Sequence, residues 1–456
     1  MTFAILAMGG ISYALLQSLV APALPDLQHA FNTSESTVSW VLTAYLLSAS
    51  VCTPLIGRLG DMYGKKRLLV IVLVLLSVGT LVSALATTMT IMLVGRVIQG
   101  AAGGIFPLAF GIIRDEFPRE RVAGGVGLMS ALLGVGGGAG VVLAGPIADS
   151  LSYHYLFWLP LIPIAAATVL TQVIVPESLV RVPSRVNWAA AALMGLGLVL
   201  VLVAVSQAPT WHWLSAKTLG CIGAGIVVLV LWVWVEMRSE SPLVDMRMMR
   251  IRGVWTTNAV AFLLGFGMYA SFILVPEFVE TSGQTYGFGA DVTHAGLFLL
   301  PATVAMLVVG AQTGRLERRF GSKPPLLAGG IFSFAAFLML TVAHEAPWEF
   351  YVAMLLLGTG IGLAFAAMAN LIIENVGPEE TGVATGMNTV TRTVGGSFGG
   401  AAVASVLGAG LATVHDYVAA FGLCAVALAA GVLVGLAIPQ RRPEATFEPH
   451  PVGDRA

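Results

Sequence analysis

Two arginines lie inside long apolar segments, where a charged side chain is costly. Arg96 stands in LVGRVIQG and Arg392 in NTVTRTVGG. In membrane hydrocarbon an arginine costs about 2.5 kcal/mol or more, so it normally faces a partner or a water-filled cavity. Both positions therefore predict groups that act on an ion or a ligand. The alternative for Arg96 is that its side chain reaches outward to the membrane surface, because it lies near the start of its apolar segment.

Carboxylates that could carry a proton stand only at the ends of the apolar segments. A proton carrier needs an acid whose pKa changes between exposed and enclosed surroundings. Asp26 and Glu277 are the candidates, and we assign Arg96 to proton coupling with them. The alternative is that both carboxylates are solvated groups at the outer surface.

The composition places most of the chain in a membrane. Of 456 residues, 57% are hydrophobic and 10% are charged, and the mean hydropathy is +0.88. A soluble domain carries roughly 25% charged residues. The net charge of -1 and the lack of a basic stripe exclude a nucleic-acid partner. The three cysteines fall in apolar segments and the histidines are scattered, so we expect no metal site.

Fourteen apolar segments are long enough to cross roughly 30 Å of hydrocarbon, which takes about 20 helical residues. The predicted spans are residues 3–25, 36–56, 68–87, 90–113, 122–146, 154–175, 187–206, 217–237, 254–277, 293–313, 325–343, 350–373, 381–408 and 415–438. With the N-terminus inside, every Lys and Arg except Lys217, Arg96 and Arg392 falls in a cytoplasmic loop or tail. The excess of arginine over lysine is typical of GC-rich bacteria. We therefore expect a multi-pass protein of a bacterial inner membrane with both termini cytoplasmic.

Two loops recur at nearly the same offset and indicate an internal duplication. GRLGDMYGKK begins at Gly57 and GRLERRFGSK at Gly314, and residues 118–120 correspond to residues 378–380. Duplicated halves are typical of secondary transporters, whose substrate site lies between them.

The duplication predicts an all-α integral membrane fold with four parts. Residues 1–176 and 254–438 form two six-helix bundles. Residues 177–253 hold two inserted central helices with their cytoplasmic linkers, and residues 439–456 are a cytoplasmic tail.

The segment after the second span resembles the major facilitator superfamily, specifically its fourteen-span drug:proton antiporter branch. The family pattern G-x-L-x-D-x-x-G-[RK]-[RK] is met by Gly57, Leu59, Asp61, Gly64, Lys65 and Lys66. The resemblance covers nearly the whole chain and implies the major facilitator fold. It also implies that Asp61 helps to close the cytoplasmic side, with Arg114 or with the start of the span near Thr381. The alternative is a merely positive cytoplasmic loop.

The fifth span carries small residues that allow helices to approach closely. They are Gly136, Gly140 and Gly145, followed by Pro146. This pattern resembles the antiporter motif of the family, although Val141 stands where a proline usually follows the glycine. The branch also usually carries an Asp in the first span, and Leu16 occupies that position here. The coupling ion and its stoichiometry are therefore left open.

Polar and aromatic residues within the spans are the candidates for lining a central cavity, since unpaired amides in hydrocarbon are costly. They are Gln17, Trp40, Tyr45, Gln99, Asn258, Tyr269, Asn370, Asn388 and Arg392.

Together these features predict a transporter and not an enzyme. We expect proton-coupled export of small amphipathic drug-like compounds by alternating access, by a monomer in the lipid bilayer, with no cofactor besides the coupling proton. GGSFG at residues 395–399 matches a hydrolase motif but lies in a glycine-rich span, where the strand-to-helix turn of a nucleophile elbow cannot form. The alternatives are an exporter of a native metabolite and a non-transporting receptor or scaffold with the same fold. The substrate itself is not predicted.

Overall fold

A computed structural model describes residues 1–178, 186–282, 286–408 and 412–439, and every regular element in these ranges is a helix. The elements are α1 (Thr2–Ser18), α2 (Leu24–Ala30), α3 (Glu35–Val38), α4 (Trp40–Tyr63), α5 (Lys65–Ala84), α6 (Met89–Gly100), η1 (Ala101–Gly104), α7 (Ile105–Glu116), α8 (Arg119–Ser150), α9 (Tyr155–Ile174), α10 (Trp188–Trp211), α11 (Ala216–Arg238), α12 (Met246–Met249), α13 (Arg252–Glu280), α14 (Val292–Phe320), α15 (Lys323–Val342), α16 (Pro347–Asn375), η2 (Pro378–Glu380), α17 (Thr381–Leu407) and α18 (Val414–Leu436).

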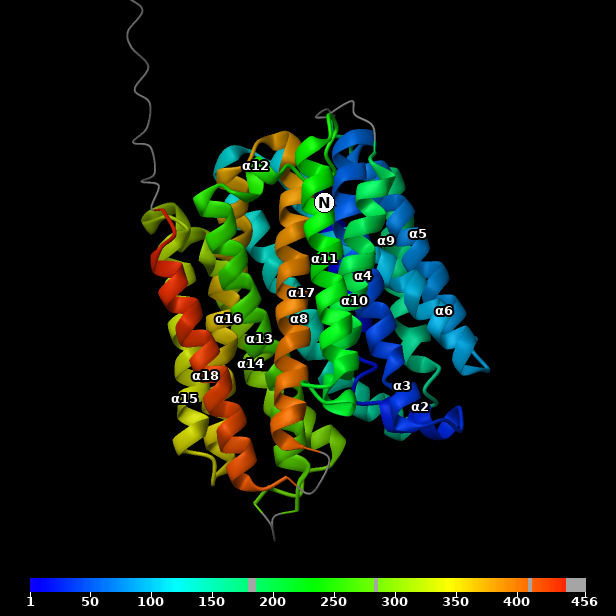
Figure 1. The fold of residues 1–456 in the computed structure, drawn as a ribbon, viewed down its shortest axis with the longest axis vertical. Helices are drawn as coiled ribbons and strands as arrows, with labels where there is room; N and C mark the ends of the chain where they lie inside the picture. The colour runs from blue at the N-terminus through cyan, green and yellow to red at the C-terminus, as the bar shows by residue number, and fades with distance from the viewer. Residues whose placement is uncertain (179–185, 283–285, 409–411, 440–456) are drawn as a thin grey trace, which may run out of the picture.

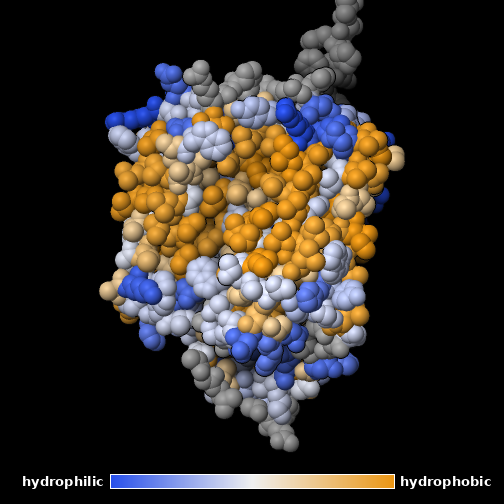
Figure 2. Space-filling view, turned by 90° about the vertical axis from the view of Figure 1, so that its right-hand side faces the viewer, coloured by the Kyte–Doolittle hydropathy of each residue, from blue (hydrophilic) through white to orange (hydrophobic). Residues whose placement is uncertain are grey.

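The long helices run side by side along the longest axis of the molecule, with α2 and α3 at one end and α12 at the other (Figure 1). Among the described residues, 12 helices are long and apolar enough to cross a membrane, counting α6, η1 and α7 as one. Figure 2 shows the surface that suits such a protein, with an apolar band between two polar ends. The predicted all-helical membrane fold is confirmed.

The predicted count of fourteen spans is not confirmed, and the two missing segments have identifiable causes. The first, residues 3–25, is helical only as far as Ser18, and Pro25 lies in the first turn of the separate helix α2. That leaves α1 with 17 residues. The second is α17, which has 27 residues and is not among the 12, because threonines, glycines and Arg392 lower its hydropathy.

Other helix boundaries differ from the prediction at the motif that follows the second span. Residues 57–63 form the last two turns of α4, and Lys65 begins α5, so the expected loop is reduced to Gly64. Gly64 has φ of 109°, a conformation that favours glycine. The predicted span 90–113 is also interrupted, since the glycine-rich residues 101–104 form the short 3₁₀ helix η1.

Within the described part of the chain, three hydrophobic clusters divide the core. One is drawn from residues 5–175, apart from Ala369 and Ile373. A second is drawn from residues 260–438, apart from Val141. The third joins residues 190–254 to α16 and α17. We refer to α1–α9 as the first half and α13–α18 as the second half.

The helices α10 and α11 form a hairpin beside the line where the two halves meet. α10 packs against both α4 and α17, and the Ser206 hydroxyl lies 3.3 Å from that of Thr43 on α4 (Figure 1). The hairpin therefore contacts both halves of the protein.

Glu236 fixes the turn that leads from this hairpin into the second half. Its carboxylate is 2% exposed and accepts hydrogen bonds from Trp232 Nε1 and from the backbone N–H of Leu243 and Val244. The short helix α12 follows at once and continues into α13.

Candidate functional site

A cavity of about 650 Å³ lies between the two halves, with α10 as part of its wall. Its lining includes five of the residues selected from the sequence, namely Gln17, Tyr45, Tyr269, Glu277 and Arg392. At one end the lining reaches the exposed side chains of Pro25, Glu277 and Glu280. We call this the Glu277 end of the molecule.

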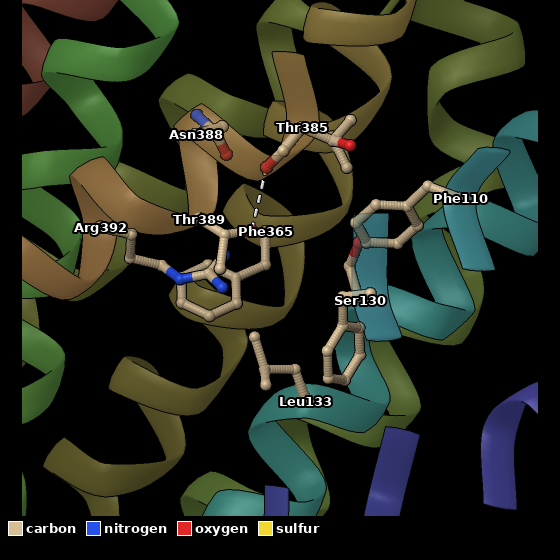
Figure 3. A pocket seen from close by; sticks show the side chains of 10 residues that line it. Phe110, Ser130, Leu133, Phe365, Thr385, Asn388, Thr389 and Arg392 are labelled. Atoms are coloured by element: carbon tan, nitrogen blue, oxygen red, sulfur yellow. Dashed lines mark hydrogen bonds between the residues drawn. The ribbon is translucent and has the colours of Figure 1, made fainter. Parts of the chain in front are cut away.

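Arg392 lies at the opposite, inner end of the cavity on α17. Its side chain is 8% exposed, and its guanidinium carbon lies 4.4 Å from the centre of the Phe365 ring. A smaller pocket adjoins this point and is lined by Asn388, Thr389 and Ser130 besides Arg392 and Phe365 (Figure 3). Arg392 and Phe365 line both spaces, so they form the floor of the large cavity.

Beyond this floor the two halves are held together around Asp61, and we call this the Asp61 end. Asp61 is 1% exposed, and its Oδ2 accepts hydrogen bonds from the N–H groups of Gly382 (3.1 Å) and Val383 (3.3 Å). These are first-turn N–H groups of α17, where a helix favours a negative charge. Lys65 Nζ lies 3.6 Å from the other Asp61 oxygen and 2.7 Å from Asp115.

Arg114 adds a second contact between the halves at the same end. Its guanidinium donates to the Thr381 hydroxyl (2.5 Å) and to the carbonyl groups of Gly377 (3.1 Å) and Val376 (3.0 Å). Asp61 and Arg114, which belong to the first half, thus both bind the first residues of α17 in the second half.

Gly57 lets the backbones of α4 and α17 meet. A methyl group added to Gly57 would collide with the Gly382 carbonyl, and one added to Gly382 would meet the Gly57 carbonyl. Any larger residue at Gly57 would therefore separate the halves beside Asp61.

A second line of contact between the halves runs along α8 and α14, and it contains a buried acid that the sequence analysis missed. Asn370 Nδ2 donates to Glu317 Oε2 (2.6 Å) and to the Ala123 carbonyl of α8 (3.2 Å). Glu317 is 5% exposed, and its other oxygen has no hydrogen-bond partner within the described ranges. The duplicated motif offered a signal, since Glu317 stands one position before the counterpart of Asp61.

Arg96 is enclosed in the first half and does not line the cavity. It is 0% exposed and donates to the carbonyl groups of Val41 (2.9 Å) and Leu16 (3.2 Å) and to the Gln99 side chain (2.7 Å). Its guanidinium also lies over the Tyr45 ring, 4.3 Å from the centre. It does not reach the surface.

The sequence of the chain matches a known protein family. The profile described as Major Facilitator Superfamily matches residues 6–400 of the chain. The chain belongs to the major facilitator superfamily. It is therefore a multi-pass membrane protein, as the apolar helices of the structure also indicate.

Relatives of this superfamily member include bacterial transporters. An uncharacterised MFS-type transporter of Mycobacterium tuberculosis is 30% identical over 87% of this chain, which spans 58% of the length of that relative. The multidrug resistance protein Stp of the same species is 27% identical over 88% of this chain and 75% of its own. In structure, the human organic anion transporter TETRAN is similar with a TM-score of 0.69 at 16% identity, covering 95% of this chain and 98% of its own, which shows the same fold.

The small residues of α8 serve two contacts in this superfamily member. Gly136 and Gly140 pack against α1, whereas Gly145 packs against Thr293 of α14. Pro146 follows within the helix and is exposed.

We expect Gly140→Ala to lower the free energy of unfolding by about 1–3 kcal/mol, because the new methyl group would overlap Ser18 and approach the Leu15 carbonyl to 3.0 Å. Thermal unfolding of the purified protein in detergent measures the change. Gly137→Ala is the matched control on the same helix, since its nearest neighbour, Phe272, would lie 4.0 Å away. Equal stability of the two variants would contradict the packing role of Gly140.

Several residues selected from the sequence lie outside the large cavity of this superfamily member. The Gln99 side chain is hydrogen-bonded to Arg96 and Thr80. Asn370 lies in the contact between α8 and α14. Asn388 donates to Asn258 (2.9 Å) and lines only the small pocket. Trp40 is half-buried at the start of α4. Each of these amides has at least one partner within the protein, although Asn258 Nδ2 has none among the described residues.

Asp26 and Glu277, the two candidate proton carriers, have different surroundings. Asp26 is exposed on α2 and does not line the cavity, whereas Glu277 does. Only Glu277 lies where a bound compound could change its environment.

Proposed function

We propose that this superfamily member exports small amphipathic drug-like compounds by alternating access. The observation that carries the proposal is a cavity walled by both halves and closed at the Asp61 end by contacts between them. Alternating access needs a central site that opens to one side at a time. The relative named as a multidrug resistance protein supports drug-like substrates.

In this proposal the Asp61 end faces the cytoplasm of a bacterial cell and the Glu277 end faces outward. The distribution of Lys and Arg supports this orientation. Phe3 contacts Phe117, and Lys323 binds the Ile438 carbonyl, so both flanks of the chain would then be cytoplasmic. With α1 and α17 as further crossings, the monomer has fourteen spans: two six-helix bundles and the α10–α11 hairpin between them.

Transport by inside-out membrane vesicles tests the proposal. The vesicles are energised to acidify their interior, and candidate compounds are added while internal pH and compound uptake are followed. We expect at least one amphipathic compound to enter the vesicles and release protons. If no compound enters the vesicles and none releases protons, the export proposal fails, and the result favours a non-transporting receptor or scaffold.

We further propose that Glu277 carries the coupling proton. It is exposed at the Glu277 end, and closure of the cavity there would remove it from water, which favours binding of a proton. We expect Glu277→Gln to reduce substrate-driven proton release by about tenfold or more, since the amide cannot titrate. The pH signal in the same vesicles measures the change.

Asp26→Asn is the control for this prediction, because Asp26 is exposed and does not line the cavity. We expect it to behave as the unmodified protein. Proton release that persists in Glu277→Gln would remove Glu277 from the coupling mechanism.

A further inference from the structure

The two intramembrane arginines of this protein have opposite surroundings. Arg96 donates hydrogen bonds to three partners and lies outside the cavity. Arg392 lines the cavity, is 8% exposed, and makes no hydrogen bond or ion pair to any residue that the structure describes. Its guanidinium lies over the face of the Phe365 ring. Arg392 is thus a buried cation whose hydrogen-bond donors remain available to a ligand.

The surroundings of Arg392 combine aromatic and apolar side chains with the polar side chains of Ser130, Asn388 and Thr389. Phe365 and Leu133 line both the large cavity and the small pocket at this point (Figure 3). Phe106 lines both spaces as well. Tyr269 also lines the large cavity, and its hydroxyl accepts a hydrogen bond from Gln17 (2.5 Å). A planar hydrophobic body could therefore pack against these rings while one end of it meets the guanidinium.

The acids of the cavity lie far from Arg392. Glu277 follows Tyr269 by eight residues on α13, which is about 12 Å along a helix. Glu280 is one turn further toward the Glu277 end. Neither carboxylate neutralises the guanidinium, so the inner end of the cavity is positively charged.

A ligand that fills this inner end leaves no room for water around Arg392. A compound without an acceptor would leave a buried charge unpaired, and a cationic compound would add repulsion. A carboxylate or phenolate oxygen would instead accept charge-assisted hydrogen bonds from the guanidinium, whose fork suits two at once. The site therefore favours an anionic oxygen attached to an apolar body.

We propose that Arg392 selects amphipathic organic anions as the substrates of this transporter. The acidic oxygen binds Arg392 at the cavity floor, and the apolar rings of the substrate lie between the aromatic side chains around it. The proposal rests on the export function proposed above, and it names the class of compound exported.

Three naphthalene compounds of nearly equal size test the selectivity: 1-naphthylacetate, its methyl ester, and (1-naphthylmethyl)trimethylammonium. Binding to the purified full chain in nanodiscs is measured by titration calorimetry, with empty nanodiscs as the blank. We expect the acid to bind at least tenfold more tightly than the ester or the cation. Equal binding of the three, tighter binding of the cation, or no binding of the acid would overturn the proposal.

Two substitutions test whether the Arg392 side chain causes the preference for the acid over the ester. Arg392→Gln should weaken binding of the acid about tenfold or more and leave the ester unchanged, whereas Arg392→Lys should keep part of the preference. Equal weakening of acid and ester by Arg392→Gln, with Arg392→Lys losing the preference as well, would assign Arg392 to structure and overturn the proposal. Thermal unfolding of each variant shows whether it is folded.

Vesicle uptake separates this proposal from the export function. If the acid binds through Arg392 but no compound enters the vesicles, export fails and the anion site stands. If cationic compounds are transported equally by the unmodified protein and by Arg392→Gln, export stands and the anion proposal is overturned.

Discussion

Asp61→Ala should leave the protein folded but unable to hold the Asp61 end closed. The carboxylate accepts two hydrogen bonds from the start of α17, and hydrogen bonds to charged groups contribute about 1.5–3 kcal/mol each. Losing about 3 kcal/mol would shift the equilibrium between closed and open states of this end by about 100-fold. We expect transport to fall by a similar factor, because the cavity would rarely open to the other side.

Accessibility of a cysteine in the cavity measures this shift directly. Cys52, Cys221 and Cys424 are first replaced by alanine, and Thr389→Cys then places one thiol at the cavity floor. In oriented vesicles, a membrane-impermeant maleimide applied from the Asp61 side should label Asp61→Ala much faster than the parent protein.

Glu116→Gln is the matched control for the loss of a carboxylate at the same end. Glu116 is the last residue of α7 and is exposed, so we expect neither labelling nor transport to change. Asp61→Asn keeps one acceptor oxygen and should give an intermediate rate. Unchanged labelling in Asp61→Ala would show that other contacts, such as those of Arg114, are sufficient to close this end.

Arg96→Ala should destabilise the first half and abolish transport. The substitution leaves the carbonyl groups of Val41 and Leu16 and the Gln99 side chain without their donor in a buried site. Each unsatisfied group costs about 1–3 kcal/mol, and we expect a total loss of about 3–5 kcal/mol in the free energy of unfolding. Thermal unfolding in detergent and vesicle uptake measure the two effects.

The control for Arg96 is a surface arginine with a similar aromatic contact. Arg238 is exposed and lies over the Trp234 ring, and Arg238→Ala should change the free energy of unfolding by about 0.5 kcal/mol or less. Arg96→Lys should recover part of the stability, since one ammonium group cannot reach all three partners. An Arg96→Ala protein that is stable and transports normally would show that Arg96 is needed neither for stability nor for transport.

The pattern of apolar segments was sufficient to predict most of the helices, but it could not place their ends where polar residues continue a helix. The span predicted at residues 325–343 is α15, Lys323–Val342. By contrast, α4 continues through Asp61, because the carboxylate is buried against α17 and needs no water. Tertiary contacts of this kind leave no mark in a hydropathy profile.

The candidate site was harder to predict than the fold. Arg392 and Asn370 look alike in the sequence, as polar residues within apolar segments, yet one lines the cavity and the other lies between α8 and α14. Most helices here are apolar on every side, so periodicity does not show which face turns inward. Glu317 was missed because it stands among Arg315, Arg318 and Arg319, which suggested a solvated loop.

Glu236 fixes the connection between the α10–α11 hairpin and the second half of the protein. Its three hydrogen bonds fix the turn before α12, and α12 leads straight into α13. In the alternating-access cycle proposed above, we therefore expect the hairpin to move with the second half and its contact with α4 to change. A hairpin that stays against α17 would cover the boundary between α4 and α17, and we expect it to block entry of a hydrophobic compound from the bilayer along this side.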